Sequence, residues 1–320
     1  MYLTWRKGRD AVEARKTLAP LVYVSVLSWN LRETTLECLA SLKQMRYPNY
    51  RIVVVDNGST DGTAEAIAEA YPDVEVAINE QNLGYAGGCN VGLRYGLAHG
   101  ACFVLAINND VSVDPAMLDE LMRWAEPDVG ILAPKIYFAS DRQRIWSVGG
   151  LRHPLTLEMT HRGDGELDRG QWDQVLERDY LVGTAHLYSR ALLEEVGLLD
   201  AGYFMYYDDP DICIRAQRAG YRLLMVPQAR MWHKVAASSG GVGTPQERYY
   251  MGRSGVRYMR KHARGVQWLF VVPWRTASTI KAVLRLLWYR RPDSARAYIR
   301  GLRDGLTIST ESREHPFCAS

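Results

Sequence analysis

The feature that most constrains this chain is a short apolar run that ends in three polar side chains. Phe103 to Ile107 has the length and composition of a buried parallel strand, and Asn108-Asn109-Asp110 follows it directly. Polar groups buried without partners are costly, so these three do not belong inside a strand. They fit the carboxyl end of a parallel strand, where open α/β sheets bind ligands, although an ordinary strand-to-helix turn uses the same residue types. The next signal, Asp114-Pro115, predicts the start of a helix.

The rest of the chain repeats this alternation of apolar strands and helices. Strands are expected at residues 22–27, 51–55, 74–78, 181–190 and 223–227, with a strand or hairpin at 146–150. Helices are expected at 34–43, 62–71 and 191–196 and after the glycine-rich turn at residue 84. This spacing predicts an α/β fold with a mostly parallel sheet and right-handed crossovers.

Two other strand ends carry groups suited to a nucleotide. Asp56 ends the second expected strand, where a carboxylate can bind a base or ribose, or can simply form an Asx turn. Gly84, Gly87 and Gly88 would let a phosphate approach the backbone at a helix N-terminus, unless they serve tight packing of that helix on the sheet. The sequence has neither a Gly-x-Gly-x-x-Gly fingerprint after the first strand nor a Walker lysine motif.

A cluster of carboxylates follows the aromatic run Tyr203–Tyr207. Asp208, Asp209 and Asp211 surround Pro210, which suits the first position of a helix, so Asp209 could be the N-cap of that helix. A cap needs only one carboxylate. Like charges this close cost energy unless a cation or a proton-transfer task justifies them, so the cluster is also a candidate catalytic site.

Two further features are interpreted from their positions. His233 follows the strand expected at 223–227, and a lone histidine is usually packed or solvated. Because Asp110 is a candidate metal ligand, His233 is equally a candidate second ligand. The polar, glycine-rich segment 161–170 is interpreted as a mobile loop near the site.

Composition and charge indicate the compartment and the kind of partner to expect. Its five cysteines are odd in number and widely spaced, which argues against a disulfide framework or zinc site and for a reducing compartment. The polar, basic segment 1–20 does not have the pattern of a secretory signal, and no apolar run is long enough to span a bilayer. Residues 246–303 carry fourteen Lys and Arg against two acidic residues, so they contribute +12 to an overall charge of +3, and the remainder carries −9. A basic tail on an acidic body indicates an anionic partner.

The expected organisation is an N-terminal extension at 1–20, a domain at 21–245 and a basic helical region at 246–320. In that region, one helical face carries the apolar residues Ile280, Val283, Leu284, Leu287 and Trp288. Such a face beside basic residues fits a helix lying in a membrane interface, or one packed on the preceding domain or on a second copy of the chain in a homo-oligomer. Nucleic acid is not expected as a partner because no recognised binding module accompanies the charge.

In this order, the motifs resemble those of family 2 glycosyltransferases with the GT-A fold, most closely the bacterial rhamnosyltransferase-like branch. The resemblance runs from about residue 21 to residue 241. It rests on Ser25–Asn30, Val54–Asp61, Asn82–Asn90, Asn108–Asp110, Gly183–Ala185, Tyr206–Asp211 and His233. It implies an inverting transfer of a sugar from a nucleotide-diphosphate donor.

The resemblance also implies roles for individual residues. Asp110 and His233 would hold Mg²⁺ or Mn²⁺ on the donor diphosphate, and Asp209, or its neighbour Asp208, would take the proton of the acceptor hydroxyl. Asn108 departs from the family's Asp-x-Asp motif, which leaves a less anionic site, and Asp208 replaces the Glu of its Glu-Asp-x-Asp motif. The implied nucleotide-binding residues are Ser28, Trp29, Asn30, Asp56, Asn57, Asn82, Gly87, Asn90 and Asn109. The implied sugar- and acceptor-binding residues are Trp146, Gly183, Thr184 and Asp211.

The activity expected from these features is a metal-dependent sugar transfer, for example of rhamnose from dTDP-rhamnose, to a glycan or a polyprenyl-linked saccharide. The enzyme would work in the cytoplasm, peripherally at the inner face of the cell membrane, in cell-surface polysaccharide synthesis. Two alternatives remain open. A sugar nucleotidyltransferase should have a glycine- and Lys/Arg-rich loop after the first strand, where this chain has Ser28-Trp29-Asn30. A non-catalytic sugar-nucleotide-binding protein would keep the fold without needing the carboxylates.

Overall fold

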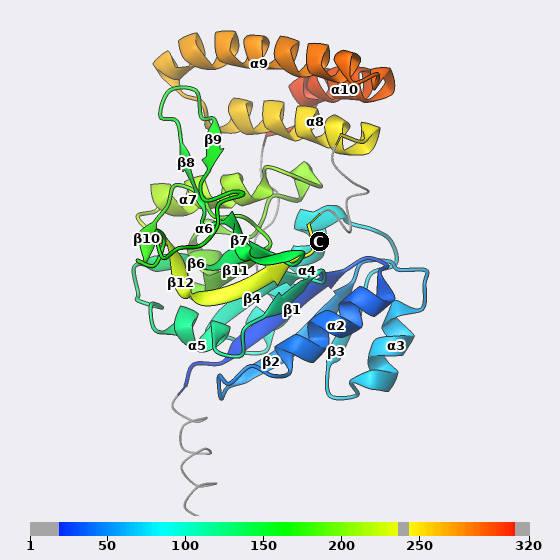
Figure 1. Ribbon diagram of the computed structural model, residues 1–320, viewed down its shortest axis with the longest axis vertical. Helices are drawn as coiled ribbons and strands as arrows, with labels where there is room; N and C mark the ends of the chain where they lie inside the picture. The colour runs from blue at the N-terminus through cyan, green and yellow to red at the C-terminus, as the bar shows by residue number, and fades with distance from the viewer. Residues whose placement is uncertain (1–18, 236–242, 311–320) are drawn as a thin grey trace, which may run out of the picture.

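The computed structural model describes residues 19–235 and 243–310 (Figure 1). The extension expected at 1–20 therefore lies almost wholly outside the described residues, as do positions 236–242 and 311–320. The described part contains one large mixed sheet with helices on both faces and three C-terminal helices beyond one end of it.

The first half of the sheet is parallel, as expected. Strand β1 lies between β2 and β4, and β3 forms the edge next to β2. Alternate residues of β1 enter different cores: Val22, Val24 and Val26 face one side, and Tyr23 faces the other. The bounds of these strands are β1 Val22–Ser28, β2 Tyr50–Asp56, β3 Glu75–Ile78 and β4 Phe103–Asn108.

The second half of the sheet is mixed. Strand β11 is antiparallel to both β4 and β6, and β12 runs parallel to β6. Two short strands, β8 and β9, form a separate hairpin that rises from the sheet toward the C-terminal helices (Figure 1). The bounds are β5 Val111–Val113, β6 Val129–Phe138, β7 Asp141–Ser147, β8 Gly150–Arg152, β9 Met159–His161, β10 Leu176–Glu177, β11 Ala185–Ser189 and β12 Arg222–His233.

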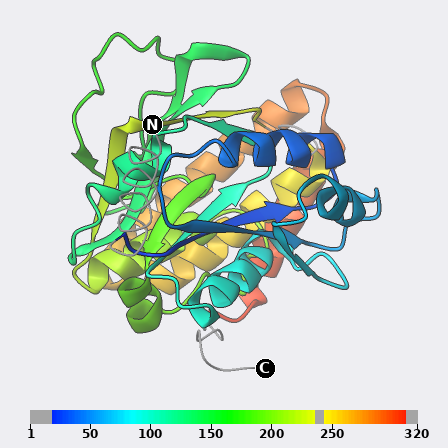
Figure 2. The ribbon, with the colours of Figure 1, turned by 90° about the horizontal axis from the view of Figure 1, so that it is seen from below.

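Helices cover both faces of the sheet, as Figure 2 shows for α2 and α4. Helices α2 (Arg32–Leu42), α3 (Thr63–Ala70) and α5 (Met117–Met122) bury their apolar residues with those of one face. Helices α4 (Gly84–Ala98), α6 (Arg190–Val196) and α7 (Asp208–Arg218) do so on the other face. The sheet is thus the middle layer of three.

Helix α4 packs against β1 through glycines spaced four residues apart. A Cβ added at Gly88 would lie 2.5 Å from Leu27, and one at Gly92 would lie 1.7 Å from the Ser25 Oγ. Positions four apart share one face of a helix, and alternate positions share one face of a strand, so the two patterns match. Of the glycines predicted to approach a phosphate or to allow close packing, Gly88 therefore serves close packing against β1, together with Gly92.

The helix predicted to begin at Asp114-Pro115 begins later, because a strand comes first. Residues Val111–Val113 form β5, which pairs antiparallel with the end of β12, and α5 starts at Met117. The Asp114 carboxylate accepts the backbone N–H of Ala116, so it supports a turn before the helix. The pairing places His233 opposite Val111, the residue after Asp110.

Two other local expectations differ from the structure. Helix α7 begins at Asp208 with Tyr207 as its N-cap, because the N–H of Asp211 already donates to the Tyr207 carbonyl; Asp209 is not the cap. The segment 161–170, interpreted from the sequence as a mobile loop, is bonded to the sheet. The buried Lys135 of β6 donates a hydrogen bond to the Asp168 carboxylate in this segment.

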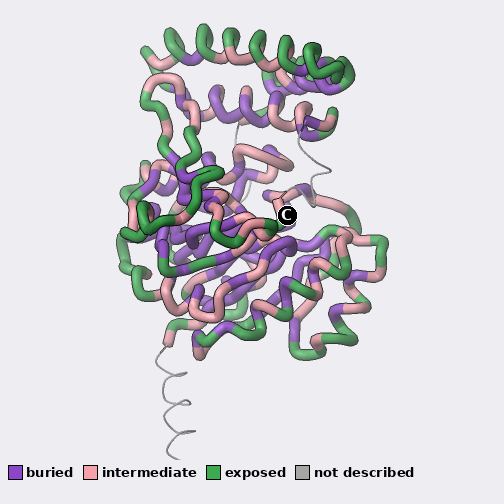
Figure 3. The backbone as a smooth tube through the Cα atoms, viewed as in Figure 1, coloured by how far each residue is buried: buried purple, intermediate pink, exposed green. Residues whose placement is uncertain are grey.

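The C-terminal region consists of α8 (Pro245–His262), α9 (Trp268–Trp288) and α10 (Pro292–Thr307). Helix α10 packs mainly on α8, whereas α9 is the outermost element and is exposed along most of its length (Figure 3). In the part of the chain that the structure describes, no helix is both long and apolar enough to cross a membrane.

Candidate active site

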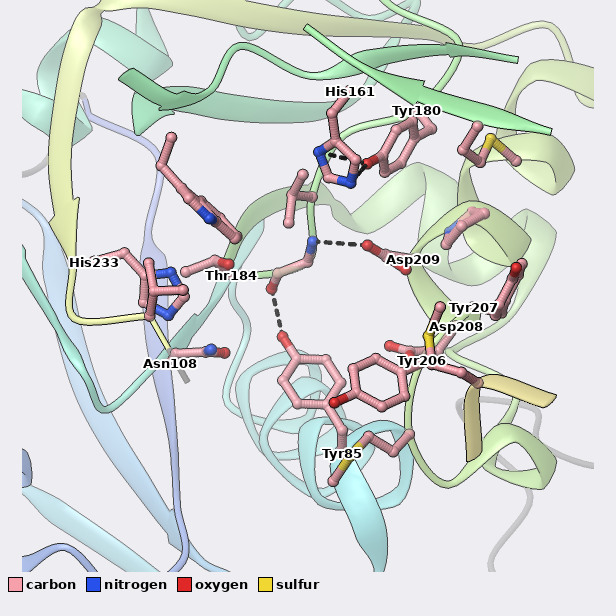
Figure 4. Close-up of a pocket in the computed structure, with 18 of the residues that line it drawn as sticks. Tyr85, Asn108, His161, Tyr180, Thr184, Tyr206, Tyr207, Asp208, Asp209 and His233 are labelled. Atoms are coloured by element: carbon pink, nitrogen blue, oxygen red, sulfur yellow. Dashed lines mark hydrogen bonds between the residues drawn. The ribbon is translucent and has the colours of Figure 1, made fainter. Parts of the chain in front are cut away.

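A cavity of about 540 Å³ opens above the carboxyl ends of the central strands. Its walls come from the end of β4, the end of β12, the segment 182–184 before β11, and the start of α7. Figure 4 shows Asn108 and His233 on one wall, Asp208 and Asp209 on the opposite wall, and Thr184 between them. Asp110, His233 and Asp209, which are far apart in sequence, therefore share one cavity.

The first wall carries buried polar atoms that have no hydrogen-bond partner among the described residues. His233 Nε2 lies 3.1 Å from Asp110 Oδ1. Within the described residues, however, neither carboxylate oxygen of Asp110 accepts a hydrogen bond, and the Asn108 Oδ1 and His233 Nδ1 atoms also lack partners. Buried polar atoms without partners are costly, so these atoms are suited to bind an ion or a ligand.

These atoms fit a divalent cation that is shared with a donor. A carboxylate, an amide oxygen and an imidazole are ligand types that Mn²⁺ and Mg²⁺ accept. Among residues 19–235 and 243–310, no group of three or more His, Cys, Asp and Glu gathers as a metal cage. A site with so few protein ligands would leave coordination positions open to oxygen atoms of a bound ligand. Trp146 closes the wall, with its ring 4.6 Å from that of His233 and nearly perpendicular to it.

The opposite wall presents two carboxylates from the first turn of α7. The backbone N–H of Gly183 donates to Asp209 Oδ2 at 3.2 Å, which orients this carboxylate toward the cavity. Burial raises the pKa of Asp209 above its ordinary value, and the Gly183 N–H only partly offsets this. The pKa of Asp208 is raised well above the ordinary value, mainly by burial and next by repulsion from Asp209. We therefore expect one carboxylate of the pair to gain and lose its proton at moderate pH.

One end of the cavity is lined by aromatic and thioether side chains to which the sequence assigned no role in the site. The Tyr85 hydroxyl donates to the Gly183 carbonyl, and the Tyr180 hydroxyl is hydrogen-bonded to His161 at 2.6 Å. This end is lined by Tyr85, Met159, Tyr180, Met205, Tyr206, Tyr207 and Met251. These residues come from five separate segments, so no local pattern could have predicted that they meet.

The residues implied in nucleotide binding gather at the same sheet edge but outside this cavity. Ser28 and Asp56 are paired in register at the ends of β1 and β2. Asp56 Oδ1 accepts the N–H of Ser59, and the Asn30 Oδ1 accepts the N–H of Thr60. Trp29 is 40% exposed beside them. This edge offers a polar and aromatic surface next to the cavity, and its role in nucleotide binding stays a prediction.

Several of these residues have structural partners instead. The Asn57 amide bonds Asn82, Asn79 and the backbone near Gly84, and Asn109 donates to the Thr35 hydroxyl. The buried Asn90 exchanges two hydrogen bonds with the backbone of Leu199, and Gly87 packs against Leu83.

The start of α4 is also occupied, contrary to the phosphate-binding interpretation. The Gly84 N–H donates to Asn82, and the Tyr85 N–H donates to the Phe204 carbonyl. Two of the N–H groups that a phosphate would need are thus already bonded within the chain.

Asp211 was expected at the acceptor site, but it lies outside the cavity. Its side chain is fully buried and is bonded to Arg215, Lys261, His262 and the Tyr203 hydroxyl. The other predicted acceptor residues, Trp146, Gly183 and Thr184, do line the cavity. Asp209 and Asp211 are two positions apart on a helix, and such residues do not face the same side.

Residues 23–197 match the family described as glycosyl transferase family 2. An N-acetylglucosaminyl-diphospho-decaprenol L-rhamnosyltransferase of Mycobacterium tuberculosis is 31% identical over 223 residues, which cover 63% of this chain and 72% of that protein. The dTDP-rhamnosyl transferase RfbF of Shigella flexneri is 21% identical over 248 residues, which cover 75% of this chain and 80% of that protein.

Among solved structures, the mannosyltransferase PcManGT of Pyrobaculum calidifontis, in complex with GDP-Man and Mn²⁺, has a similar fold. It superposes with a TM-score of 0.58 at 17% identity, over 96% of this chain and 94% of that one.

Proposed function

Because the chain belongs to glycosyl transferase family 2 and has the GT-A fold, we propose that it transfers L-rhamnose from a dTDP-linked donor to a saccharide carried on a polyprenyl diphosphate. The observation that carries this proposal is the shared cavity, in which Asp110 and His233 face Asp209. Family membership makes the chain a glycosyltransferase. The names of the two rhamnosyltransferases support the choice of donor sugar and of acceptor carrier.

Asp110 and His233 hold a divalent cation with the donor diphosphate in this proposal, and Asn108 lies beside them. The cation offsets the negative charge that develops on the leaving diphosphate. Among the described residues the Asp110 oxygens accept no hydrogen bond, which supports this role. The Mn²⁺ in the complex of the Pyrobaculum enzyme supports Mn²⁺ as the first ion to test, with Mg²⁺ beside it.

Asp209 is the base that takes the proton of the acceptor hydroxyl. It is only partly buried, it lines the cavity, and the Gly183 N–H holds its carboxylate in place. Asp208 is the more deeply buried of the two, and its raised pKa favours the protonated form. A protonated Asp208 leaves Asp209 as the carboxylate that accepts a proton. A direct displacement needs only one base and no covalent enzyme intermediate, so the proposed transfer inverts the anomeric centre.

The test is a transfer assay with the purified protein. dTDP-L-rhamnose and a panel of UDP- and GDP-sugars are supplied with Mn²⁺ or Mg²⁺ and a short polyprenyl diphosphate that carries N-acetylglucosamine. The proposal expects acceptor-dependent release of dTDP from dTDP-rhamnose, and its loss with EDTA. No turnover of any donor would refute it. Metal-dependent binding without turnover or hydrolysis would identify a sugar-nucleotide-binding protein, and condensation of a sugar phosphate with a nucleoside triphosphate would identify a nucleotidyltransferase.

We also propose that α9 places the enzyme on the inner surface of the cell membrane, where a polyprenyl-linked acceptor resides. Most of the face predicted from the sequence is exposed: Ile280 is 56% exposed, Leu284 61% and Trp288 85%. Basic residues flank it, including Lys281 and Arg285, which complements an anionic bilayer. The alternative of a helix packed on the preceding domain is less well supported, because most of these apolar residues are exposed and α9 is the outermost helix (Figure 1).

A further inference from the structure

The segment that leads into the candidate base has a strained backbone. Phe204, Tyr206 and Tyr207 have φ values of 63°, 63° and 66°, in the left-handed region that side chains with a Cβ avoid. Asp208 and Asp209 follow immediately, and Met205, Tyr206 and Tyr207 themselves line the cavity. A strained turn persists only when its surroundings hold it, so the contacts of this turn determine where Asp209 points.

The C-terminal helix α8 supplies contacts to the middle of this turn. The buried Ser254 hydroxyl lies 3.1 Å from the Tyr203 carbonyl and 2.9 Å from the Met205 carbonyl, so it can donate to either. Arg253 also donates to the Tyr203 carbonyl, at 3.2 Å, and the ring of Tyr250 stacks on Phe204 with centroids 4.9 Å apart.

Helix α8 also connects the two ends of the turn. Lys261 Nζ lies 2.7 Å from Asp200, just before the turn, and 2.7 Å from Asp211, just after the catalytic pair. Burial alone would raise the pKa of Asp211, but Arg215, His262 and Lys261 hold it well below its ordinary value, so this carboxylate stays charged. A single ammonium group therefore holds both ends of the segment that carries the base.

We propose that Lys261 and Ser254 are positioning residues that hold Asp209 against the acceptor hydroxyl. This inference rests on the proposed function, because it takes Asp209 as the base. In this proposal the C-terminal region has two roles: α8 positions the base, and α9 presents the exposed apolar face. Neither residue lines the cavity, so neither contacts the donor there.

The test compares Lys261→Met with Lys261→Arg. The methionine variant should fold, because Asp200 keeps Arg257 and Asp211 keeps Arg215 and His262 as partners. We expect its kcat to fall about tenfold or more while its Kd for dTDP and its donor KM stay within about twofold, since small misplacements of a catalytic group cost rate and not donor binding. Lys261→Arg should recover most of the rate. The matched control is Lys43→Met, which removes a surface lysine that pairs with Asp73.

Ser254→Ala gives a second test that removes only one hydroxyl. Its kcat should fall with donor affinity unchanged, and hydrogen exchange of the peptide 203–211 should rise in both this variant and Lys261→Met. An unchanged kcat in both variants, a parallel loss of donor affinity, or unchanged exchange at 203–211 would overturn the inference. Should the wild type turn over no donor, the proposed function itself would be refuted, and the exchange measurement would still decide whether α8 holds this turn.

Discussion

At the scale of single residues, the Asp209 carboxylate is the proposed base. Replacing it in Asp209→Asn preserves an oxygen that can accept the Gly183 N–H but removes the ability to take a proton. We expect the transfer rate to fall by about 10² to 10⁴ while dTDP binding, measured by calorimetry with Mn²⁺, stays as in the wild type. Full activity in this variant would assign the base to another residue.

The same carboxylate predicts the pH dependence of the reaction. Asp209 must be ionised to accept a proton, so activity is present above its pKa and is lost as pH falls through it. Because burial raises the pKa of Asp209, the acid limb of kcat/KM should have its midpoint above the ordinary aspartate value of about 4. The measurement is a pH profile at saturating metal. A rate that stays level down to pH 4 would contradict it.

His233 predicts how the cation is held. Its Nε2 lies 3.1 Å from Asp110, and its Nδ1 has no partner among the described residues. In His233→Ala we expect Mn²⁺ affinity in the presence of dTDP, measured by titration calorimetry, to weaken by about tenfold or more. The control is His99→Ala, which removes an exposed histidine of the α4 C-terminus. Equal Mn²⁺ affinities in both variants would exclude His233 as a ligand.

At the scale of elements, α4 has to lie close to β1 because its glycines leave no room for side chains. Gly92→Ala would put a Cβ 1.7 Å from the Ser25 Oγ, and we expect it to lower the free energy of unfolding by about 1–3 kcal/mol. The control, Gly87→Ala, lies in the same helix with Leu83 at 3.0 Å as its nearest neighbour and should cost less. Urea unfolding of both variants measures this. The packing argument fails if Gly92→Ala is the more stable of the two.

Pairing between distant elements forms the cavity wall that carries Asp110 and His233. Strand β12 ends beside β5, and the N–H of Lys234 donates to the Asp110 carbonyl. This contact places His233 next to a carboxylate more than a hundred positions earlier in the chain. The sequence indicated each residue as a candidate, but only the β5–β12 pairing brings them together.

At the scale of the whole molecule, the exposed face of α9 predicts membrane binding. The full chain should float with vesicles that contain anionic lipid and remain unbound to neutral ones. Leu284→Ser with Leu287→Ser should abolish flotation while leaving transfer to a water-soluble acceptor intact, since neither residue lines the cavity. Ile78→Ser with Leu167→Ser removes two exposed apolar residues outside the C-terminal helices and should not affect flotation. Absence of flotation together with a dimer that the α9 variant dissociates would assign this face to a second copy.

The sequence alone was sufficient for the parallel half of the sheet, its helices and the motifs that mark the family, because apolar periodicity and strand-end polarity are local properties of a chain. It was also sufficient to propose Asp110, His233 and Asp209. It placed Asp211 at the acceptor site, and it could not separate a phosphate-binding glycine turn from close packing. The roles of these residues depend on contacts with distant parts of the chain. Lys261 and His262 contact Asp211, and the Gly183 N–H orients Asp209. The Phe204 carbonyl accepts an N–H at the start of α4. Contacts between segments far apart in sequence are made only when the chain folds, so the tertiary structure decided them.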